Sequence, residues 1–151
     1  MNVPNRRIRI LFVCGGNTCR SPMAKAILQK ALSDRGVAGR YQIDSAAYGT
    51  PTHRGASKNA REAIIGMLGT DLLADHIAKS LDRDLAERAD LILVMNASMK
   101  RSLPSGKTHT LKEYAGGSGG IQDPYGGDLD TYFTCAKDIS QAIDAILPRI
   151  L

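Results

Sequence analysis

A continuous apolar run that ends in a cysteine and two glycines most constrains the fold of this chain. Residues 7–13 (Arg-Ile-Arg-Ile-Leu-Phe-Val) end in four apolar residues, a pattern typical of a strand buried on both faces. A Gly-Gly-Asn turn signal follows at 15–17, and Ser-Pro at 21–22 opens a stretch with helical apolar spacing over 23–35. Strand, tight turn and helix together predict a βα unit of a parallel sheet.

Strands and helices alternate along the rest of the chain. We expect strands at 41–47, 90–95 and 107–111, and helices at 57–68, 82–89, 97–103 and 130–147, the last of them capped by Asp130. This order predicts an α/β fold with a parallel sheet and helices on both faces. With 151 residues, 43% of them apolar, and no visible linker or repeat, residues 1–151 are expected to form a single domain.

Parallel sheets hold ligands beyond the carboxyl ends of their strands. Loops 14–21, 47–56 and 96–98 meet that description. The glycine-rich loop 115–128 lies beyond the last strand and is long enough to close over them.

The loop after the first strand combines a nucleophile with an anion cradle. Successive backbone N–H groups from residues 15–20 can surround one anion, aided by the positive end of the following helix. The planar fork of Arg20 can grip two phosphate oxygens. The same donors favour the thiolate form of Cys14, to which the hydroxyl of Ser21 can donate. Thiol-based phosphoryl transfer needs this combination.

A leaving group also needs a proton, which Cys14 and Arg20 cannot give. Asp123, on the long loop, is the best candidate for a general acid. A plain Asx-Pro turn explains Asp123 equally well when the Cys14 loop is left aside. Asp128 is the alternative acid.

Several segments together resemble one enzyme family. They are Val13-Cys14-x-Gly16-Asn17-x-Cys19-Arg20-Ser21-Pro22-Met23-Ala24, Ile43-Asp44-Ser45, His76-x-Ala78-Lys79, residues 90–95 and Asp123-Pro124-Tyr125. This set resembles the low molecular weight protein tyrosine phosphatases over essentially the whole chain. The resemblance implies a flavodoxin-like three-layer sandwich around a four-stranded parallel sheet, no cofactor, and a two-step reaction through a phosphocysteine.

The resemblance also implies roles for individual residues. It makes Cys14, Arg20 and Asp123 catalytic. Substrate binding falls to Gly15, Gly16, Asn17, Thr18 and Cys19 of the loop, and Asn17, Ser21, Ser45 and His76 match family positions that stiffen the phosphate loop by hydrogen bonds. Residues 48–55 match no family member, but Tyr48 and Tyr125 can flank a phenol ring or a guanidinium plane of the substrate. The expected partners are phosphorylated protein substrates, with inorganic phosphate as product.

Thr18 bears on the choice of substrate. Family members that act on phosphotyrosine commonly have a branched apolar residue there, so Thr18 looks like the bacterial branch that includes protein arginine phosphatases. Its hydroxyl gives a polar wall that suits a phosphoguanidinium better than an apolar ring, which favours phosphoarginine slightly over phosphotyrosine. Gly15, Ala47 and Asn96 depart from the family pattern; many members have an acid at the position of Asn96.

Two rival functions use the same loop. A thiol redox enzyme of the arsenate reductase type would need a further cysteine pair, and residues 70–100 contain no cysteine. A reversible disulfide between Cys14 and Cys19 remains feasible, whereas Cys135 is expected in the helix core. A phosphopeptide-binding module is disfavoured because binding alone needs neither a thiol nor an acid.

Composition narrows the partners further. The net charge of +5 and the pI near 9.3 favour anionic substrates; nucleic acid is disfavoured because no run of Lys or Arg occurs. The chain has no segment long enough to span a membrane, no secretion signal and no cluster with metal-ligand spacing. We therefore expect a cytoplasmic protein without a metal and without a membrane partner.

Overall fold

The structure is a computed structural model that describes residues 6–151; residues 1–5, where the sequence predicts no secretion signal, lie outside the described residues. The elements in chain order are β1 (Ile8–Cys14), α1 (Arg20–Asp34), η1 (Ala38–Arg40), β2 (Tyr41–Ala47), α2 (Lys58–Leu68), α3 (Arg83–Arg88), β3 (Leu91–Val94), η2 (Ala97–Lys100), β4 (Thr108–Thr110), α4 (Leu111–Tyr114) and α5 (Leu129–Ile150).

The four strands form one parallel sheet in the order β2-β1-β3-β4. β1 therefore lies in the interior of the sheet, with Ile10 beside Ile43 on one side and beside Leu91 on the other. Its last five residues are all buried, because helices cover both faces there. The predicted four-stranded parallel sheet of a flavodoxin-like α/β fold is confirmed.

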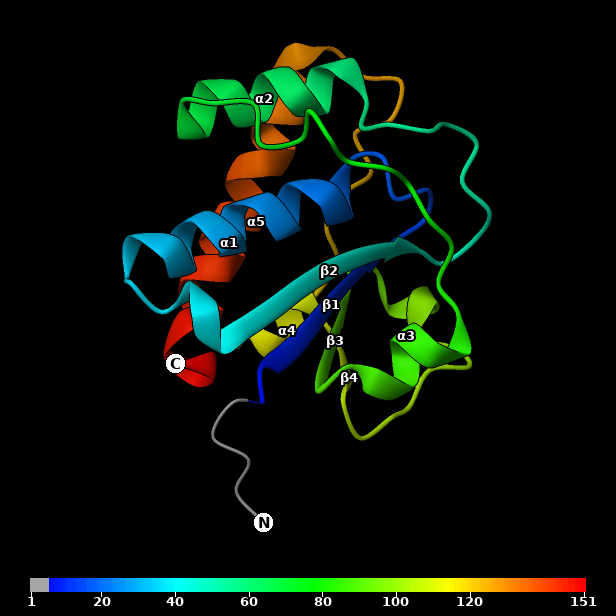
Figure 1. Cartoon of the computed structure of the whole chain (residues 1–151). Helices are drawn as coiled ribbons and strands as arrows, with labels where there is room; N and C mark the ends of the chain where they lie inside the picture. The colour runs from blue at the N-terminus through cyan, green and yellow to red at the C-terminus, as the bar shows by residue number, and fades with distance from the viewer. Residues whose placement is uncertain (1–5) are drawn as a thin grey trace.

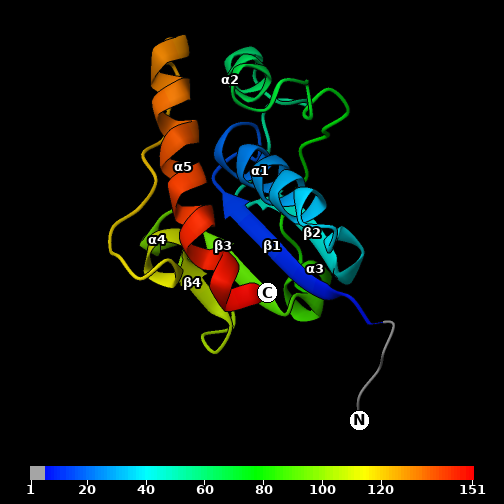
Figure 2. The ribbon, with the colours of Figure 1, turned by 90° about the vertical axis from the view of Figure 1, so that its left-hand side faces the viewer.

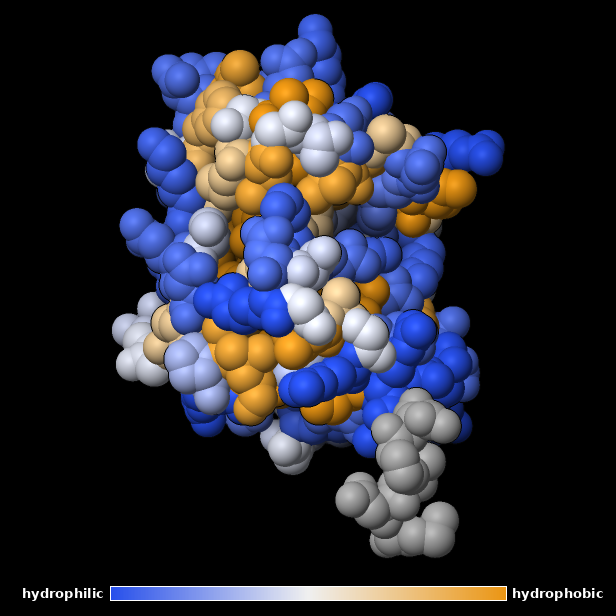
Figure 3. All heavy atoms as spheres, turned by 60° about the vertical axis from the view of Figure 1, so that its left-hand side comes forward, coloured by the Kyte–Doolittle hydropathy of each residue, from blue (hydrophilic) through white to orange (hydrophobic). Residues whose placement is uncertain are grey.

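Helices α1 and α5 cover one face of the sheet, α2 packs outside them, and α3 lies on the opposite face (Figures 1 and 2). Because α1 contacts the sheet, α2 and α5, nine of its fifteen residues are buried and its apolar residues do not keep to one narrow stripe. Apolar side chains also show between polar ones on the outside of this layer (Figure 3).

The carboxyl ends of the strands meet at one edge of the sheet. Cys14 ends β1, and Asn96 follows the neighbouring strand β3 two residues after its end. The chain between β2 and α2 and the loop before α5 reach the same edge (Figure 1). This edge therefore collects all the loops that the sequence assigns to ligand binding.

Several element boundaries differ from the sequence-based expectation, and for two of them the structure shows the reason. The helix expected at 97–103 is the short 3₁₀ helix η2, which ends before Ser102 takes a left-handed backbone conformation with φ 64°. The strand expected at 107–111 stops at Thr110, because the Thr110 hydroxyl and the Glu113 carboxylate form a capping box that starts α4.

The residue that caps the last helix also differs. Asp128, not Asp130, is the N-cap of α5: its carboxylate accepts a hydrogen bond from the backbone N–H of Thr131 at 2.9 Å. Asp130 lies in the first turn, where a negative charge favours the helix dipole without capping. Among residues 6–151, no helix combines the length and the apolar character needed to cross a membrane.

We expect Leu28→Ala to lower the free energy of unfolding by about 2–5 kcal/mol, because Leu28 on α1 is fully buried and its loss leaves a cavity. The matched control is Leu72→Ala, at a side chain that is 43% exposed; its loss should cost less than about 1 kcal/mol. Urea unfolding measures both values. Equal losses in the two variants would contradict this account of the core.

Candidate active site

The loop between β1 and α1 carries Cys14 at its start and Arg20 at its end. Asn17, in the middle of the loop, has φ 58° and so adopts the left-handed conformation. Asparagine and glycine tolerate this conformation better than other residues do. This turn points the backbone N–H of Asn17 at the sulfur of Cys14, with an N···Sγ distance of 3.3 Å. At least one main-chain donor of the loop therefore faces the sulfur.

Buried side chains hold this sulfur in place. Ser21 Oγ lies 2.9 Å from Cys14 Sγ and accepts a hydrogen bond from Asn17 Nδ2 at 2.8 Å. With its oxygen already accepting, the Ser21 hydroxyl has its proton to donate to Cys14 Sγ. Asn17 Nδ2 also donates to Ser45 Oγ on β2, at 3.0 Å. These bonds hold the sulfur between the loop and the first turn of α1.

The segment after α2 completes the support of Asn17. The backbone N–H of Lys79 donates to Asn17 Oδ1 at 3.1 Å, and His76 Nε2 lies 2.7 Å from the Asn17 carbonyl oxygen. Because a carbonyl can only accept, His76 Nε2 must carry the proton. The structure thus brings Ser21, Ser45 and His76 together around Asn17, the arrangement expected of residues that stiffen the phosphate loop.

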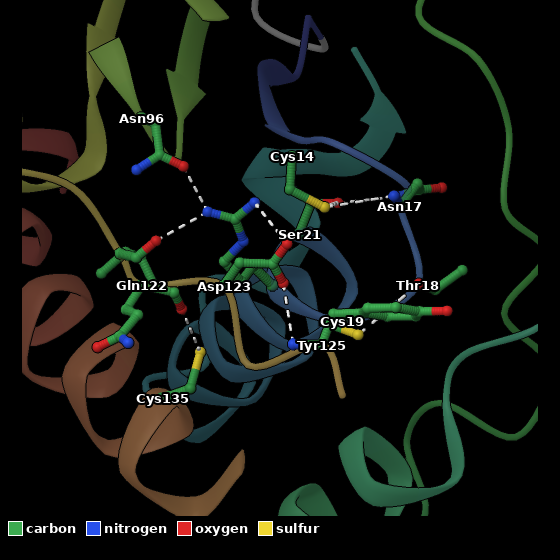
Figure 4. A network of polar contacts seen from close by, with 12 residues as sticks. Cys14, Asn17, Thr18, Cys19, Ser21, Asn96, Gln122, Asp123, Tyr125 and Cys135 are labelled. Carbon is green, nitrogen blue, oxygen red and sulfur yellow. Dashed lines mark hydrogen bonds and ion pairs between the residues drawn. The ribbon is translucent and has the colours of Figure 1, made fainter. Parts of the chain in front are cut away.

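Arg20 is 4% exposed, and its guanidinium bonds to Asn96, which lies at the same edge of the sheet (Figure 4). Nη1 donates to Asn96 Oδ1 and to the backbone carbonyl of Ile121, the latter at 2.7 Å. Nη2 lies 3.8 Å from a carboxylate oxygen of Asp123. Asn96 is a partner that sequence reasoning missed, although its place directly beyond β3, beside the loop of Cys14, is a usable signal.

The acid-bearing loop is fixed to the sheet just before Asp123. Ile121 N–H donates to the carbonyl of Met95 at 2.9 Å, and Gly120 packs so closely that an added Cβ would lie 2.3 Å from Asn96 Nδ2. One carboxylate oxygen of Asp123 accepts from the backbone N–H of Tyr125 at 3.1 Å. Asp123 keeps 58% of its side chain exposed and is free to meet a substrate.

These elements enclose a small pocket of about 80 Å³. It is lined by Cys14, Gly16, Thr18, Cys19, Arg20, Thr52, His53, Asp123 and Tyr125. All three residues expected to be catalytic line it. Thr52 and His53 were not expected; they follow β2 in one of the three loops assigned to ligands, and that position was the available signal.

Three residues expected to bind substrate do not line this pocket. Tyr48 points its hydroxyl to the carbonyl of Arg101, at 3.0 Å. Gly15 is exposed beside the pocket, and Asn17 lies buried beneath it, where it holds the loop. The alternative acid Asp128 lines a separate hollow along α5, and bonds to Thr131 lower the pKa of its carboxyl.

All three cysteines are free, buried thiols; Cys14 and Cys19 both line the pocket, whereas Cys135 does not. Cys19 Sγ lies 3.4 Å from the hydroxyl of Tyr132 and 3.5 Å from Ser57 Oγ; burial and the bond with Cys19 raise the pKa of Tyr132 to about 12. Cys135 lies in the helix core as expected and donates to the carbonyl of Gln122 at a sulfur–oxygen distance of 3.7 Å; burial raises the pKa of Cys135 to about 12.

A comparison of the sequence with models of known protein families identifies the family of this chain. A sequence model described as low molecular weight phosphotyrosine protein phosphatase matches residues 9–150. The chain belongs to this family. The match runs from β1 to the last turn of α5, and so includes every element that builds the pocket. The family resemblance drawn from the sequence is confirmed.

Proteins similar to this chain are named for two different activities, arginine phosphatase and tyrosine phosphatase. A protein-arginine-phosphatase of Bacillus subtilis is 36% identical over 148 residues, covering 93% of this chain and 95% of that protein. The crystal structure of a low molecular weight protein tyrosine phosphatase from T. tengcongensis has a TM-score of 0.88 and 39% identity, covering 95% of this chain and 99% of that one.

A further solved structure similar to this chain carries a modification at its active site. In this structure of the YwlE arginine phosphatase, a serine that replaces a cysteine at the active site is phosphorylated. The TM-score is 0.85, the identity is 30%, and 95% of both chains is covered.

His76 makes the support of the phosphate loop sensitive to pH. Burial lowers the pKa of His76 below its ordinary value of 6.5, a shift that the hydrogen bond to Asn17 partly opposes. The unfolded chain therefore binds a proton more readily than the folded one, and stability falls as the pH drops through 6.5 toward the lower folded value.

We expect the melting temperature of the wild type to fall more than that of His76→Gln when the pH is lowered from about 7.5 to about 5.5. Glutamine keeps an N–H donor for the Asn17 carbonyl but does not titrate. Melting curves of both proteins across this range measure the difference. Two parallel curves would show that His76 does not couple to folding.

Proposed function

We propose that this chain is a cysteine-dependent protein phosphatase that acts through a phosphocysteine intermediate. The observation that carries the proposal is the placing of Cys14, Arg20 and Asp123 in one pocket, with Cys14 Sγ beside the Ser21 hydroxyl and the Asn17 amide. A buried thiol, a buried cation and a carboxyl group supply a nucleophile, a phosphate anchor and a proton donor.

In the first step, Cys14 Sγ attacks the phosphorus of the bound phosphoryl group. The bond from phosphorus to the leaving nitrogen or oxygen breaks, and the carboxyl group of Asp123 gives that atom its proton. In the second step, water attacks the phosphocysteine and gives a proton to the Asp123 carboxylate. The S–P bond then breaks, which releases inorganic phosphate and restores the thiolate.

Arg20 steadies the phosphoryl oxygens in both steps. Its Nη1 is already held by Asn96 and Ile121, so the orientation of the guanidinium is fixed before substrate arrives. The phosphorylated serine of the YwlE relative supports a covalent intermediate at the position of the nucleophile. Its likeness to this chain extends over 95% of both proteins.

Within this class we favour phosphoarginine in proteins as the substrate over phosphotyrosine. Polar residues line much of the pocket: Thr18, which is buried, and Thr52 and His53, which are exposed. Tyr125 is the one phenol ring among the lining residues, and it is 69% exposed at the mouth. Polar walls suit a guanidinium, whereas a buried phenol ring prefers apolar contacts. The name of the Bacillus subtilis relative points the same way.

We expect Asp123→Asn to lower kcat on p-nitrophenyl phosphate by about 10²–10⁴-fold while phosphate still binds, because the variant cannot give up a proton. Cys14→Ser should abolish turnover. Asp128→Asn is the matched control and should keep kcat within about twofold, because Asp128 caps α5 outside the pocket.

Steady-state kinetics and competition by phosphate measure these effects. Full activity of Cys14→Ser would overturn the mechanism. A loss in Asp128→Asn instead of Asp123→Asn would move the acid to Asp128.

Thr18→Ile should reverse the substrate preference. The wild type is expected to show a higher kcat/KM on phosphoarginine peptides than on phosphotyrosine peptides, and the variant the opposite, because isoleucine replaces the Thr18 hydroxyl at the wall with methyl groups. Matched peptides that carry the two phosphorylated residues in one sequence allow a direct comparison. A wild type that prefers phosphotyrosine, with a ratio that Thr18→Ile leaves unchanged, would refute the choice of phosphoarginine.

A further inference from the structure

Arg20 is a buried cation whose buried partners are all neutral. Its side chain is 5% exposed, and within residues 6–151 its Nη1 bonds to the Asn96 amide oxygen and the Ile121 carbonyl and to no other group. The carboxylate closest to it there is that of Asp123, a long ion pair at 3.8 Å whose acid is 58% exposed. A buried cation with only this distant, solvated counter-charge is incompletely compensated, and it attracts any anion that can reach it.

Asn96 is built into the site rather than resting on its surface. It follows β3 at the carboxyl edge of the sheet (Figure 4), and its amide oxygen accepts a hydrogen bond from Arg20 Nη1. Its amide nitrogen packs on Gly120, where an added Cβ would be only 2.3 Å away. The adjoining peptide is fixed as well, because Ile121 N–H donates to the carbonyl of Met95. The amide of Asn96 therefore contacts both the arginine and the acid-bearing loop.

We propose that Asn96 is a positioning residue that holds Arg20 without neutralising it, and so sets the affinity of the site for the phosphoryl group. The inference rests on the proposed phosphatase function. An amide oxygen accepts a hydrogen bond from Nη1 as a carboxylate would, but it leaves the charge of the guanidinium available to the dianion of the substrate and to the phosphate product.

Aspartate has nearly the same shape as asparagine but carries a negative charge, so Asn96→Asp tests the charge of this position alone. In Asn96→Asp, a carboxylate would contact Arg20 permanently and would repel a phosphate bound to the other side of the guanidinium. The same carboxylate would supply the buried cation with a counter-ion in the empty site. If Asn96 acts by leaving the charge of Arg20 free, Asn96→Asp binds phosphate more weakly but is no less stable than the wild type. If the substitution only damages packing, both phosphate affinity and stability fall.

The test compares wild type, Asn96→Asp and Asn59→Asp at constant ionic strength. Asn59 is the matched control: it lies on α2, away from Arg20, and donates to the carbonyl of Gly127 at 3.4 Å. Inorganic phosphate competes with p-nitrophenyl phosphate, which gives its inhibition constant, and melting without phosphate reports stability. We expect the inhibition constant to rise about tenfold or more in Asn96→Asp, with an equal or higher melting temperature, and to stay within about twofold in Asn59→Asp.

An inhibition constant that Asn96→Asp leaves within about twofold of wild type would overturn the inference. So would an equal rise in Asn59→Asp, or a rise accompanied by a lower melting temperature, because either would mean that net charge or packing is responsible. A wild type that does not hydrolyse p-nitrophenyl phosphate would refute the proposed function instead. The stabilisation of each protein by added phosphate would then compare their affinities directly.

Discussion

The site depends on the clamp around Asn17. Its left-handed backbone turns one N–H toward Cys14, and nothing in the loop alone would hold that conformation. Ser21 and Ser45 accept from its amide, and the segment that holds His76 and Lys79 binds its two oxygens. An anion cradle of this kind has to be rigid before substrate binds, because donors that must be ordered during the reaction stabilise less.

The sheet supplies the second condition, which is proximity. Because β1 pairs with both β2 and β3, the loops that follow these strands emerge side by side, although they are far apart in sequence. Cys14 and Asn96 are brought together in this way, and the backbone of Ile121 adds the acid-bearing loop through its bond to Met95. The strands that precede these loops are packed in the apolar core, which keeps the spacing between the loops fixed.

Much of this could be predicted from the sequence, because the strongest signals are local. The strand at 41–47 agrees in both bounds, and the buried run before Cys14 forms a strand as predicted. Ser21, Ser45 and His76, which the structure places around Asn17, were named from the motifs of the sequence. His53 was not, because a histidine in a loop gives no sign of which cavity it faces until the loop is folded.

Other differences arise from competition between neighbouring residues of similar propensity. Asp128 and Asp130 are both good N-cap residues, and the structure selects the one whose carboxylate meets Thr131. Tyr48 was expected in the pocket because of its type and its place after β2, but its hydroxyl reaches Arg101 instead. The choice of the capping residue and the direction of Tyr48 both depend on where a side chain points, and this cannot be read from residue spacing alone.

The two hydrogen bonds of the Ile121 backbone have a consequence for how this loop can evolve. Its N–H and its carbonyl tie position 121 to β3 and to Arg20, while Gly117 N–H is bonded back to the carbonyl of Lys112. Insertions or deletions at residues 118 and 119 would thus be absorbed between two anchored points. Loop length can change there without displacing Asp123, whereas one residue gained or lost between 121 and 123 would move Asp123 away from Arg20.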